Sequence, residues 1–177
     1  SVLGDVSATS VLDLYAGTGA LGIEALSRGA SHAVFVENAR PALEALRKNI
    51  ASLGLASSAV VVATPVARAI RGLSGYNPFD LVFVDPPYAD LAEAAEAIEQ
   101  PVDIGRCSER ACVVLEHAAR DAAPELKGLL REDTRRYGDT SLTFYVVQSP
   151  PITKADRGNE QIDEEAREDV SSAPADG

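Results

Sequence analysis

The stretch Val11-Leu-Asp-Leu-Tyr-Ala-Gly-Thr-Gly-Ala-Leu-Gly22 decides the fold. A short apolar run leads directly into Gly17, Gly19 and Gly22, which have the spacing G-x-G-x-x-G. Glycines at such positions let the backbone turn sharply and approach a ligand closely. The stretch therefore predicts a strand, a tight turn and a helix, with a nucleotide-like ligand at the turn. A tight turn without any ligand is the alternative interpretation.

The same alternation of short apolar runs and helical stretches continues over residues 10–147. We predict strands over Val11–Leu14, Ala33–Val36, Ala59–Ala63, Leu81–Val84, Ala111–Leu115, Thr134–Tyr137 and Thr140–Val147. We predict helices over Ala20–Arg28, Pro41–Leu53, Val66–Leu73 and Leu91–Glu99, and a further helical region before the last two strands. This order is typical of an α/β fold with a mostly parallel sheet and helices on both faces. The Gly138-Asp139 link predicts a hairpin between the last two strands.

Two acidic residues favour a particular ligand. Glu37 closes the second predicted strand, where its carboxylate can accept both hydroxyl hydrogens of a ribose. Asp13 lies at the end of the first strand, where a carboxylate repels a pyrophosphate and attracts an amino group. The pair favours S-adenosylmethionine over NAD, and capping of the next helix is the other interpretation of Asp13.

The segment Asp85-Pro86-Pro87-Tyr88 follows a solidly apolar strand and is the strongest chemical signal in the chain. The two prolines fix the backbone and offer no N–H donors. An exocyclic amine has two N–H donors, which the Asp85 carboxylate and the Pro86 carbonyl can accept. Tyr88 offers a flat face on which a base can stack. We therefore expect this loop to hold a nucleobase amine in line with a methyl donor, where positioning supplies much of the catalysis.

Together these loops resemble the class I S-adenosylmethionine-dependent methyltransferases that modify nucleobase amines. More narrowly, the chain resembles the RsmD-type family, the 16S ribosomal RNA (guanine-N2)-methyltransferases. The likeness covers about residues 8–147. It rests on the segments Leu12–Gly19, Gly22–Ala30, Val34–Glu37, Asp85–Tyr88 and Tyr137–Thr140.

The resemblance implies a Rossmann-like, seven-stranded sheet with an antiparallel C-terminal hairpin, over a single domain at residues 1–148. It also implies site residues. The cofactor would be bound by Asp13, Tyr15, Ala16, Gly17, Thr18, Gly19, Glu37, Asn38, Val66 and Asp85. The flipped guanine would be received by Asp85, Pro86, Pro87 and Tyr88. The implied partner is ribosomal RNA of the small subunit, with or without bound ribosomal proteins, and no metal is implied.

Three other functions fit part of the sequence. Adenine-N6 methyltransferases share the Asp85–Tyr88 pattern, so that pattern alone does not separate adenine from guanine. An NAD-dependent oxidoreductase fits the glycine turn and Glu37 but gives no role to Asp85–Tyr88. An inactive nucleotide-binding fragment is the third.

Glu116 ends the fifth predicted strand at the ligand-binding edge of the sheet, where it either touches the target base or RNA or is simply solvated.

Composition limits the remaining choices. The chain has 177 residues and a net charge of −11, which argues against a protein that coats nucleic acid non-specifically. We expect residues 149–177, which are acidic and poor in large apolar side chains, to form a disordered tail. Two cysteines, Cys107 and Cys112, fit a reducing compartment better than a disulfide framework. No apolar run approaches the ~20 residues of a membrane span. We expect a cytoplasmic protein, and we expect it to be a monomer.

Overall fold

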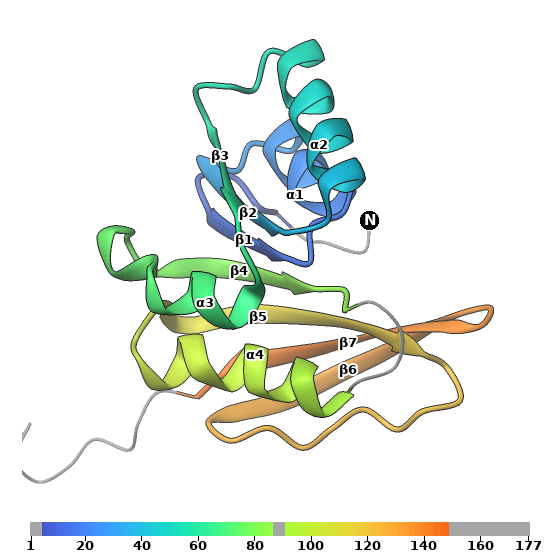
Figure 1. Cartoon of the computed structure of the whole chain (residues 1–177). Coiled ribbons are helices and arrows are strands. Elements are labelled where there is room, and N and C mark those ends of the chain that lie inside the picture. The colour runs from blue at the N-terminus through green and yellow to red at the C-terminus, as the bar shows by residue number, and fades with distance from the viewer. Residues whose placement is uncertain (1–4, 87–90, 149–177) are drawn as a thin grey trace, which may run out of the picture.

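The computed structural model describes residues 5–86 and 91–148. Its core is one seven-stranded sheet in the order β3-β2-β1-β4-β5-β7-β6. The strands are β1 Ser10–Leu14, β2 His32–Glu37, β3 Ala59–Ala63, β4 Phe79–Val84, β5 Cys107–Ala118, β6 Leu129–Tyr137 and β7 Thr140–Val147. The first five strands pair in parallel, and β7 runs antiparallel to both β5 and β6 (Figure 1). This arrangement confirms the predicted α/β sheet and its antiparallel end.

Helices cover both faces of the sheet. They are α1 Ala20–Ser27, α2 Arg40–Ser52, α3 Val66–Arg71 and α4 Leu91–Asp103, with a short 3-10 helix, η1, at Leu73–Gly75. Apolar side chains of α3 and α4 join one core cluster, and those of α1 and α2 join a second cluster on the opposite face. Figure 1 shows α3 and α4 side by side on the same face, over the middle of the sheet.

Apolar sequence explains why the central strands form where they do. Every residue of β1 is buried, as is all of β4 except Asp80. Strands covered on both faces read as continuous apolar runs, which is the pattern that the sequence shows here. β3 is half-exposed because it is an edge strand.

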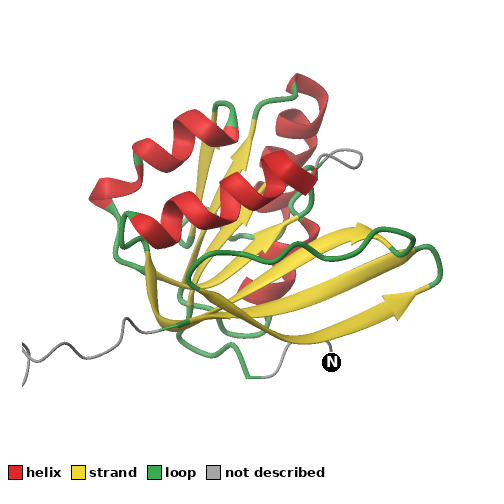
Figure 2. Ribbon diagram, turned by 90° about the horizontal axis from the view of Figure 1, so that it is seen from below, coloured by secondary structure: helices red, strands yellow, loops and turns green. Residues whose placement is uncertain are grey.

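The C-terminal hairpin forms at the predicted turn. Tyr137 pairs with Thr140 across Gly138-Asp139, and Gly138 has a positive φ of 61°. A two-residue link with positive φ matches the twist of paired strands. Figure 2 shows β6 and β7 as long strands that reach beyond the helices.

One predicted element is wrong. The helical region expected before the hairpin is absent from the described residues, where β5 runs on to Ala118 and an irregular segment leads to β6 at Leu129. Pro124 lies in the middle of this segment, and its carbonyl accepts a hydrogen bond from the Tyr145 hydroxyl at 2.8 Å. Gly128 follows with a positive φ of 76°. Proline and a left-handed glycine both interrupt a helix, and they outweigh the alanine-rich composition around them.

Other element bounds differ by smaller amounts. The fifth strand begins at Cys107 instead of Ala111, through a bulge near Arg110, which has a positive φ of 63°. The last helix continues to Asp103 although Pro101 lies inside it. The predicted tail lies outside the described residues.

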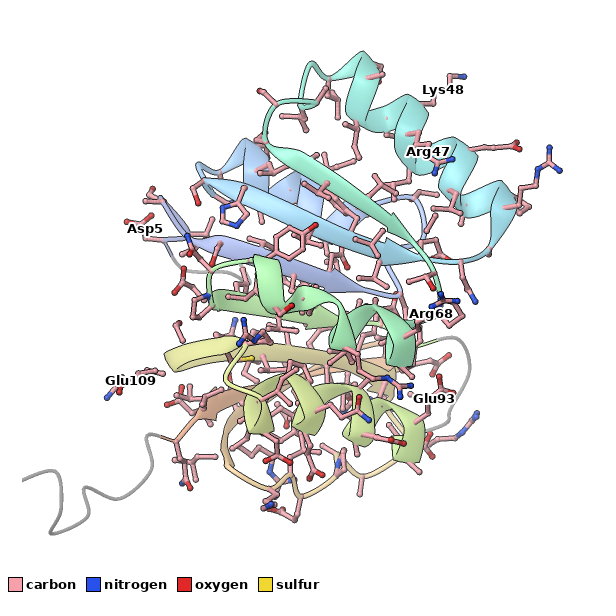
Figure 3. The ribbon with its side chains drawn as sticks, turned by 60° about the vertical axis from the view of Figure 1, so that its left-hand side comes forward. Asp5, Arg47, Lys48, Arg68, Glu93 and Glu109 are labelled. Carbon is pink, nitrogen blue, oxygen red and sulfur yellow. The ribbon has the colours of Figure 1, made fainter. Side chains whose placement is uncertain are left out.

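The parallel strands all end at the same edge of the sheet, which we call the carboxyl edge; the amino edge is the opposite one. Figure 3 shows Arg68 and Glu93 at the carboxyl edge, and Asp5 and Glu109 at the amino edge. No helix among the described residues is both long and apolar enough to cross a membrane. The carboxyl edge is where open α/β sheets bind ligands.

Candidate active site

The turn between β1 and α1 is shaped by its glycines. Gly17 and Gly19 have positive φ angles of 56° and 86°, which favour glycine. A Cβ on Gly17 would meet only the Tyr15 carbonyl oxygen, at 4.0 Å, so the space beside it is not filled by another side chain. A Cβ on Gly19 would instead collide with Leu46, and one on Gly22 with the Phe35 ring. Gly19 and Gly22 therefore allow close packing of α1 and α2 on the sheet, and contact between Gly17 and a ligand stays a prediction.

Asp13 is buried beneath this turn. Its Oδ2 accepts a hydrogen bond from the backbone N–H of Gly22 at 3.0 Å, in the first turn of α1. Burial raises the pKa of Asp13 to about 7, the Gly22 N–H opposes that rise, and the charges of Asp85 and Glu37 add to it. The hydrogen bond matches the helix-capping interpretation, and contact between Asp13 and a cofactor stays a prediction.

Glu37 ties the end of β2 to the glycine turn. Its Oε2 accepts the Gly17 N–H at 2.8 Å, and its Oε1 accepts the N–H groups of Asn38 and Ala39, both at 2.7 Å. A carboxylate has about four acceptor positions, so three are occupied by backbone. One acceptor position therefore remains for a ribose hydroxyl. A second hydroxyl would have to share a carboxylate lone pair with one of these backbone N–H groups.

Asp85 follows the last residue of β4 and opens into a pocket of about 250 Å³. Leu91, at the start of α4, also lines this pocket. The other lining residues come from the loop after β4, from the end of β5 and the loop that follows it, and from the turn before β7: Pro86, Glu116, His117, Ala118, Arg120, Asp121, Asp139 and Thr140. Partial burial raises the pKa of Asp85. Its carboxylate makes no hydrogen bond or ion pair among residues 5–86 and 91–148, so both oxygens remain available.

His117 forms the buried wall of this pocket. Its Nδ1 lies 3.1 Å from the Ala118 carbonyl, which only accepts, so Nδ1 carries the proton. Its Nε2 then accepts from the Thr143 hydroxyl at 2.9 Å, and Thr143 in turn accepts from Thr134 at 3.0 Å. Both ring nitrogens are engaged, so His117 shapes the pocket and has no free nitrogen for a ligand.

The remaining predicted site residues divide into three groups. Ala16, Thr18 and Asn38 lie in the loops at the carboxyl edge, where Thr18 and Asn38 are exposed. Val66 is buried in the core cluster under α3, and its contact with adenine stays a prediction. Pro87 and Tyr88 lie outside the described residues.

Tyr15 carries a link that the sequence did not reveal. It has a positive φ of 59°, and its hydroxyl donates to Glu93 of α4 at 3.1 Å. This bond connects the glycine turn to the helix that follows the Asp85 loop. The hydrogen bonds from His117, which lines the Asp85 pocket, to Thr143 and onward to Thr134 were also missed. Their only sequence signal is polar residues within strands, which a single sequence does not separate from surface polarity.

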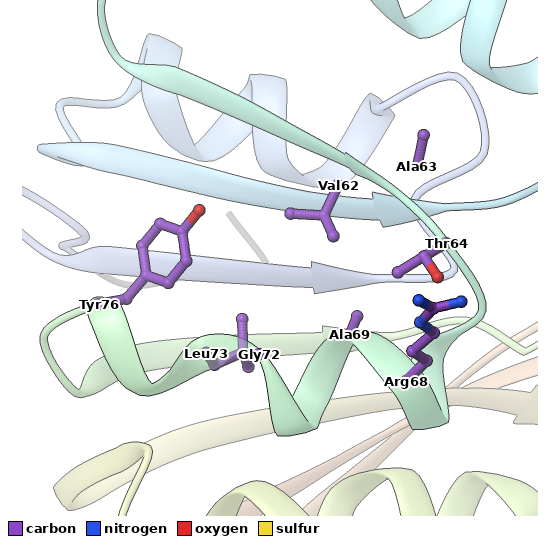
Figure 4. Close-up of a pocket in the computed structure, with 8 residues that line it drawn as sticks. All are labelled: Val62, Ala63, Thr64, Arg68, Ala69, Gly72, Leu73 and Tyr76. Carbon is purple, nitrogen blue, oxygen red and sulfur yellow. The ribbon is translucent and has the colours of Figure 1, made fainter.

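A second hollow of about 470 Å³ lies along β3, α3 and η1 (Figure 4). Arg68 and Thr64 lie at one end of it and Tyr76 at the other. None of its eight lining residues is acidic. A ligand that carries positive charge is therefore better matched by the carboxylates near the Asp85 pocket.

Comparisons with known proteins agree with this geometry. Residues 2–146 match the family model described as "Conserved hypothetical protein 95". The chain is 34% identical to YlbH of Bacillus subtilis over 139 residues, which are 76% of this chain and 73% of YlbH. It is 36% identical to the "Ribosomal RNA small subunit methyltransferase D" of Escherichia coli over 115 residues, which are 64% of this chain and 55% of that protein. The match therefore spans about half of the Escherichia coli relative.

The fold has solved counterparts. A conserved hypothetical protein of Streptococcus pyogenes superposes with a TM-score of 0.73 and 36% identity, covering 80% of this chain and 88% of that one.

Proposed function

The chain belongs to the family described as Conserved hypothetical protein 95, the RsmD-type methyltransferases, and on that premise we propose that it methylates the N2 amine of a guanine in 16S ribosomal RNA. The methyl donor is S-adenosylmethionine, and the substrate is small-subunit RNA, naked or carrying ribosomal proteins. We further propose that the protein acts as a monomer in the cytoplasm, without a metal.

The observation that carries this proposal is the Asp85 carboxylate, which opens into a pocket at the same sheet edge as the glycine turn. Parallel register places the ends of β1 and β4 next to each other, with Leu14 paired to Val84. A ligand on the glycine turn and a base in the pocket would therefore meet at Asp85.

The residues present fit the methyl donor. No side chain fills the space beside the Gly17 α-carbon. Burial raises the pKa of Asp13, and the negative charges of Asp85 and Glu37 lie close enough to raise it further. Such a field attracts the sulfonium and ammonium groups of S-adenosylmethionine and repels a pyrophosphate. S-adenosylmethionine supplies a methyl carbon that is activated by its sulfonium, and the electron pair of the breaking S–C bond stays on sulfur as the N–C bond forms.

Asp85 has two tasks in this proposal. Its carboxylate accepts one N–H of the substrate amine, and the Pro86 carbonyl accepts the other, which directs the nitrogen lone pair at the methyl carbon. As the new bond forms, the nitrogen gains positive charge and must lose one proton. A carboxylate with a raised pKa is a better acceptor for that proton than an ordinary exposed one.

The choice of substrate rests on the named relative. The Escherichia coli protein is called a ribosomal RNA small subunit methyltransferase, and it is 36% identical to this chain over 115 residues. No observation in the structure favours adenine over guanine, so adenine-N6 methylation is an outcome that the test must detect.

The test begins with calorimetry on the full chain. We expect S-adenosylmethionine and its demethylated product to bind, and NAD not to bind. Transfer of labelled methyl groups is then measured to unmodified small subunits, naked 16S ribosomal RNA and duplex DNA. Label in the ribosomal substrates alone supports the proposal, whereas NAD binding or label in DNA alone contradicts it.

A further inference from the structure

Glu116 and Asp85 occupy equivalent positions on neighbouring parallel strands. Phe83 pairs with Val114 and Val84 with Leu115, so Asp85 and Glu116 come next, one residue further along each strand. Phe83 and Val114 both belong to the core cluster under α1 and α2. Because side chains alternate along strands, the two carboxylates project toward that same face.

Both carboxylates face one pocket, and neither is bonded to a residue of the described ranges. Asp85 and Glu116 line the same 250 Å³ space. Across the ranges 5–86 and 91–148, the Glu116 carboxylate has no hydrogen bond or ion pair. Partial burial raises the pKa of Glu116, and the charge of Asp85 raises it further. Two acceptors held together without a donor are stabilised by a ligand that brings donors.

The bases differ in what they present to two such acceptors. The Watson–Crick edge of guanine offers two adjacent donors, N1–H and the N2 amine. The corresponding edge of adenine offers an amine beside an N1 lone pair, which a carboxylate repels. Neighbouring strands lie roughly 4.8 Å apart, so acceptors projecting from them can reach two adjacent, roughly parallel N–H bonds.

We propose that Glu116 is the residue that selects guanine, by accepting N1–H while Asp85 accepts from the N2 amine. This inference rests on the proposed function and names the basis of its base specificity. His117 and Arg120, which line the same pocket, do not compete for the role. His117 has both ring nitrogens engaged, and Arg120 is exposed beside Asp121, with their charged groups 3.9 Å apart.

The test compares two bases that share the reacting amine. After the methylated position is mapped, 16S ribosomal RNA is assembled with either guanine or 2-aminopurine there. 2-Aminopurine keeps the N2 amine but has a lone pair instead of N1–H. For the full wild-type chain, we expect kcat/KM to favour guanine by roughly 10- to 100-fold, as for loss of a hydrogen bond to a charged group.

Glu116→Gln should reduce this preference to within about threefold, because the Gln amide N–H₂ can donate to the N1 lone pair. Asp121→Asn is the matched control: it removes one negative charge from the same pocket and should leave the preference unchanged. Glu116→Asp keeps an acceptor and should keep the preference for guanine at a lower rate.

Three results would overturn the role of Glu116: an unchanged preference in Glu116→Gln, an equal loss in Asp121→Asn, or a wild-type enzyme that uses both bases equally. The last needs no variant, so it applies even if Glu116→Gln fails to fold. A wild-type chain that transfers no methyl group to guanine at all contradicts the proposed function instead, which separates the two failures.

Discussion

The carboxylates at the two edges of the sheet differ in how many hydrogen-bond donors the fold supplies to them. At the amino edge, Asp80 of β4 accepts hydrogen bonds from the backbone N–H of Ser10 at 2.9 Å, the Ser10 hydroxyl at 3.1 Å and the Ser108 hydroxyl at 2.7 Å. Burial acts to raise the pKa of Asp80, but these hydrogen bonds outweigh it, so the pKa is lowered. Asp80 therefore connects β4 to β1 and β5, and its carboxylate accepts three hydrogen bonds from them.

At the carboxyl edge, the same strands end in carboxylates with few donors. Asp85 follows the last residue of β4 and Glu116 lies near the end of β5, and burial raises the pKa of each. Asp13 has one donor, from Gly22, and its pKa is raised to about 7. The acceptor oxygens of Asp80 therefore stabilise the fold, whereas most of those at the carboxyl edge have no donor among residues 5–86 and 91–148, and we expect a ligand to supply one. Glu37 is intermediate between Asp80 and Asp85, since its carboxylate accepts three backbone N–H groups, one of them from the glycine turn.

The largest effect that would test this comparison is on methyl transfer. Asp85→Asn should lower the rate of transfer by roughly 10³-fold, because the variant loses the charge and the acceptor that position the amine. Binding of S-adenosylmethionine, measured by calorimetry, should survive. Asp80→Asn, the same change at the amino edge, should leave the rate per folded molecule nearly unchanged. Equal activity of Asp85→Asn and wild type would remove Asp85 from the mechanism.

The next effect is on stability against pH. The carboxyl of Asp13 titrates at 3.8 in the unfolded chain and at about 7 in the fold, so the folded state binds the extra proton between those values. The free energy of unfolding should therefore fall as pH rises from about 4 to 7, by an amount on the order of 3 kcal/mol. Urea unfolding at several pH values should show a flatter profile for Asp13→Asn. Parallel profiles for the two proteins would contradict the raised pKa.

The contribution of Asp80 to the free energy of unfolding should depend on pH with the opposite sign and a smaller magnitude. Its folded pKa is lowered from 3.8, so its stabilising contribution is present above that value and is lost as pH falls through the lowered pKa. We expect Asp80→Asn to be destabilised by roughly 1 kcal/mol at neutral pH, after allowing for its partial exposure. The gap between Asp80→Asn and wild type should close in strong acid. A gap independent of pH would mean that packing alone, and not the charge, makes the contribution.

The smallest effect is expected for an exposed ion pair on the surface of α2. Arg40 and Glu44 form an exposed ion pair at 3.0 Å on α2. Arg40→Ala should change the free energy of unfolding by no more than roughly 0.5 kcal/mol, since exposed pairs contribute little. A loss comparable to that of Asp80→Asn would show that the amino edge is not special.

Most of the fold could be predicted because its signals are local. The predicted bounds of Ala59–Ala63 and Thr140–Val147 match β3 and β7, since apolar or β-branched runs and a glycine turn mark them. The helix predicted before the hairpin was wrong because alanine content suggested it, while Pro124 and tertiary contacts decide the path there. The early part of β5, Ser108 to Arg110, was missed because its side chains are polar and the strand is held by pairing and a bulge.

The features of the site also divide into those that local sequence predicts and those that depend on contacts between distant parts of the chain. Asp85, Glu37 and the glycine turn follow strands directly, so their meeting at one edge follows from parallel topology. The saturation of Asp80 was not predicted because its donors, Ser10 and Ser108, are about 70 and 28 positions away in the chain. The Tyr15–Glu93 bond was missed for the same reason. A single sequence shows which residues end a strand, but not which acceptors the fold has already used.

The central claim is that the carboxyl edge holds a guanine amine at Asp85 and methylates it. The most direct measurement is mass spectrometry of nucleosides from unmodified small subunits incubated with the full chain and S-adenosylmethionine. We expect N2-methylguanosine at one position with the wild type, and its formation with Asp85→Asn to be slower by roughly 10³-fold. The appearance of N6-methyladenosine instead, or equal N2-methylguanosine from Asp85→Asn, would contradict the central claim.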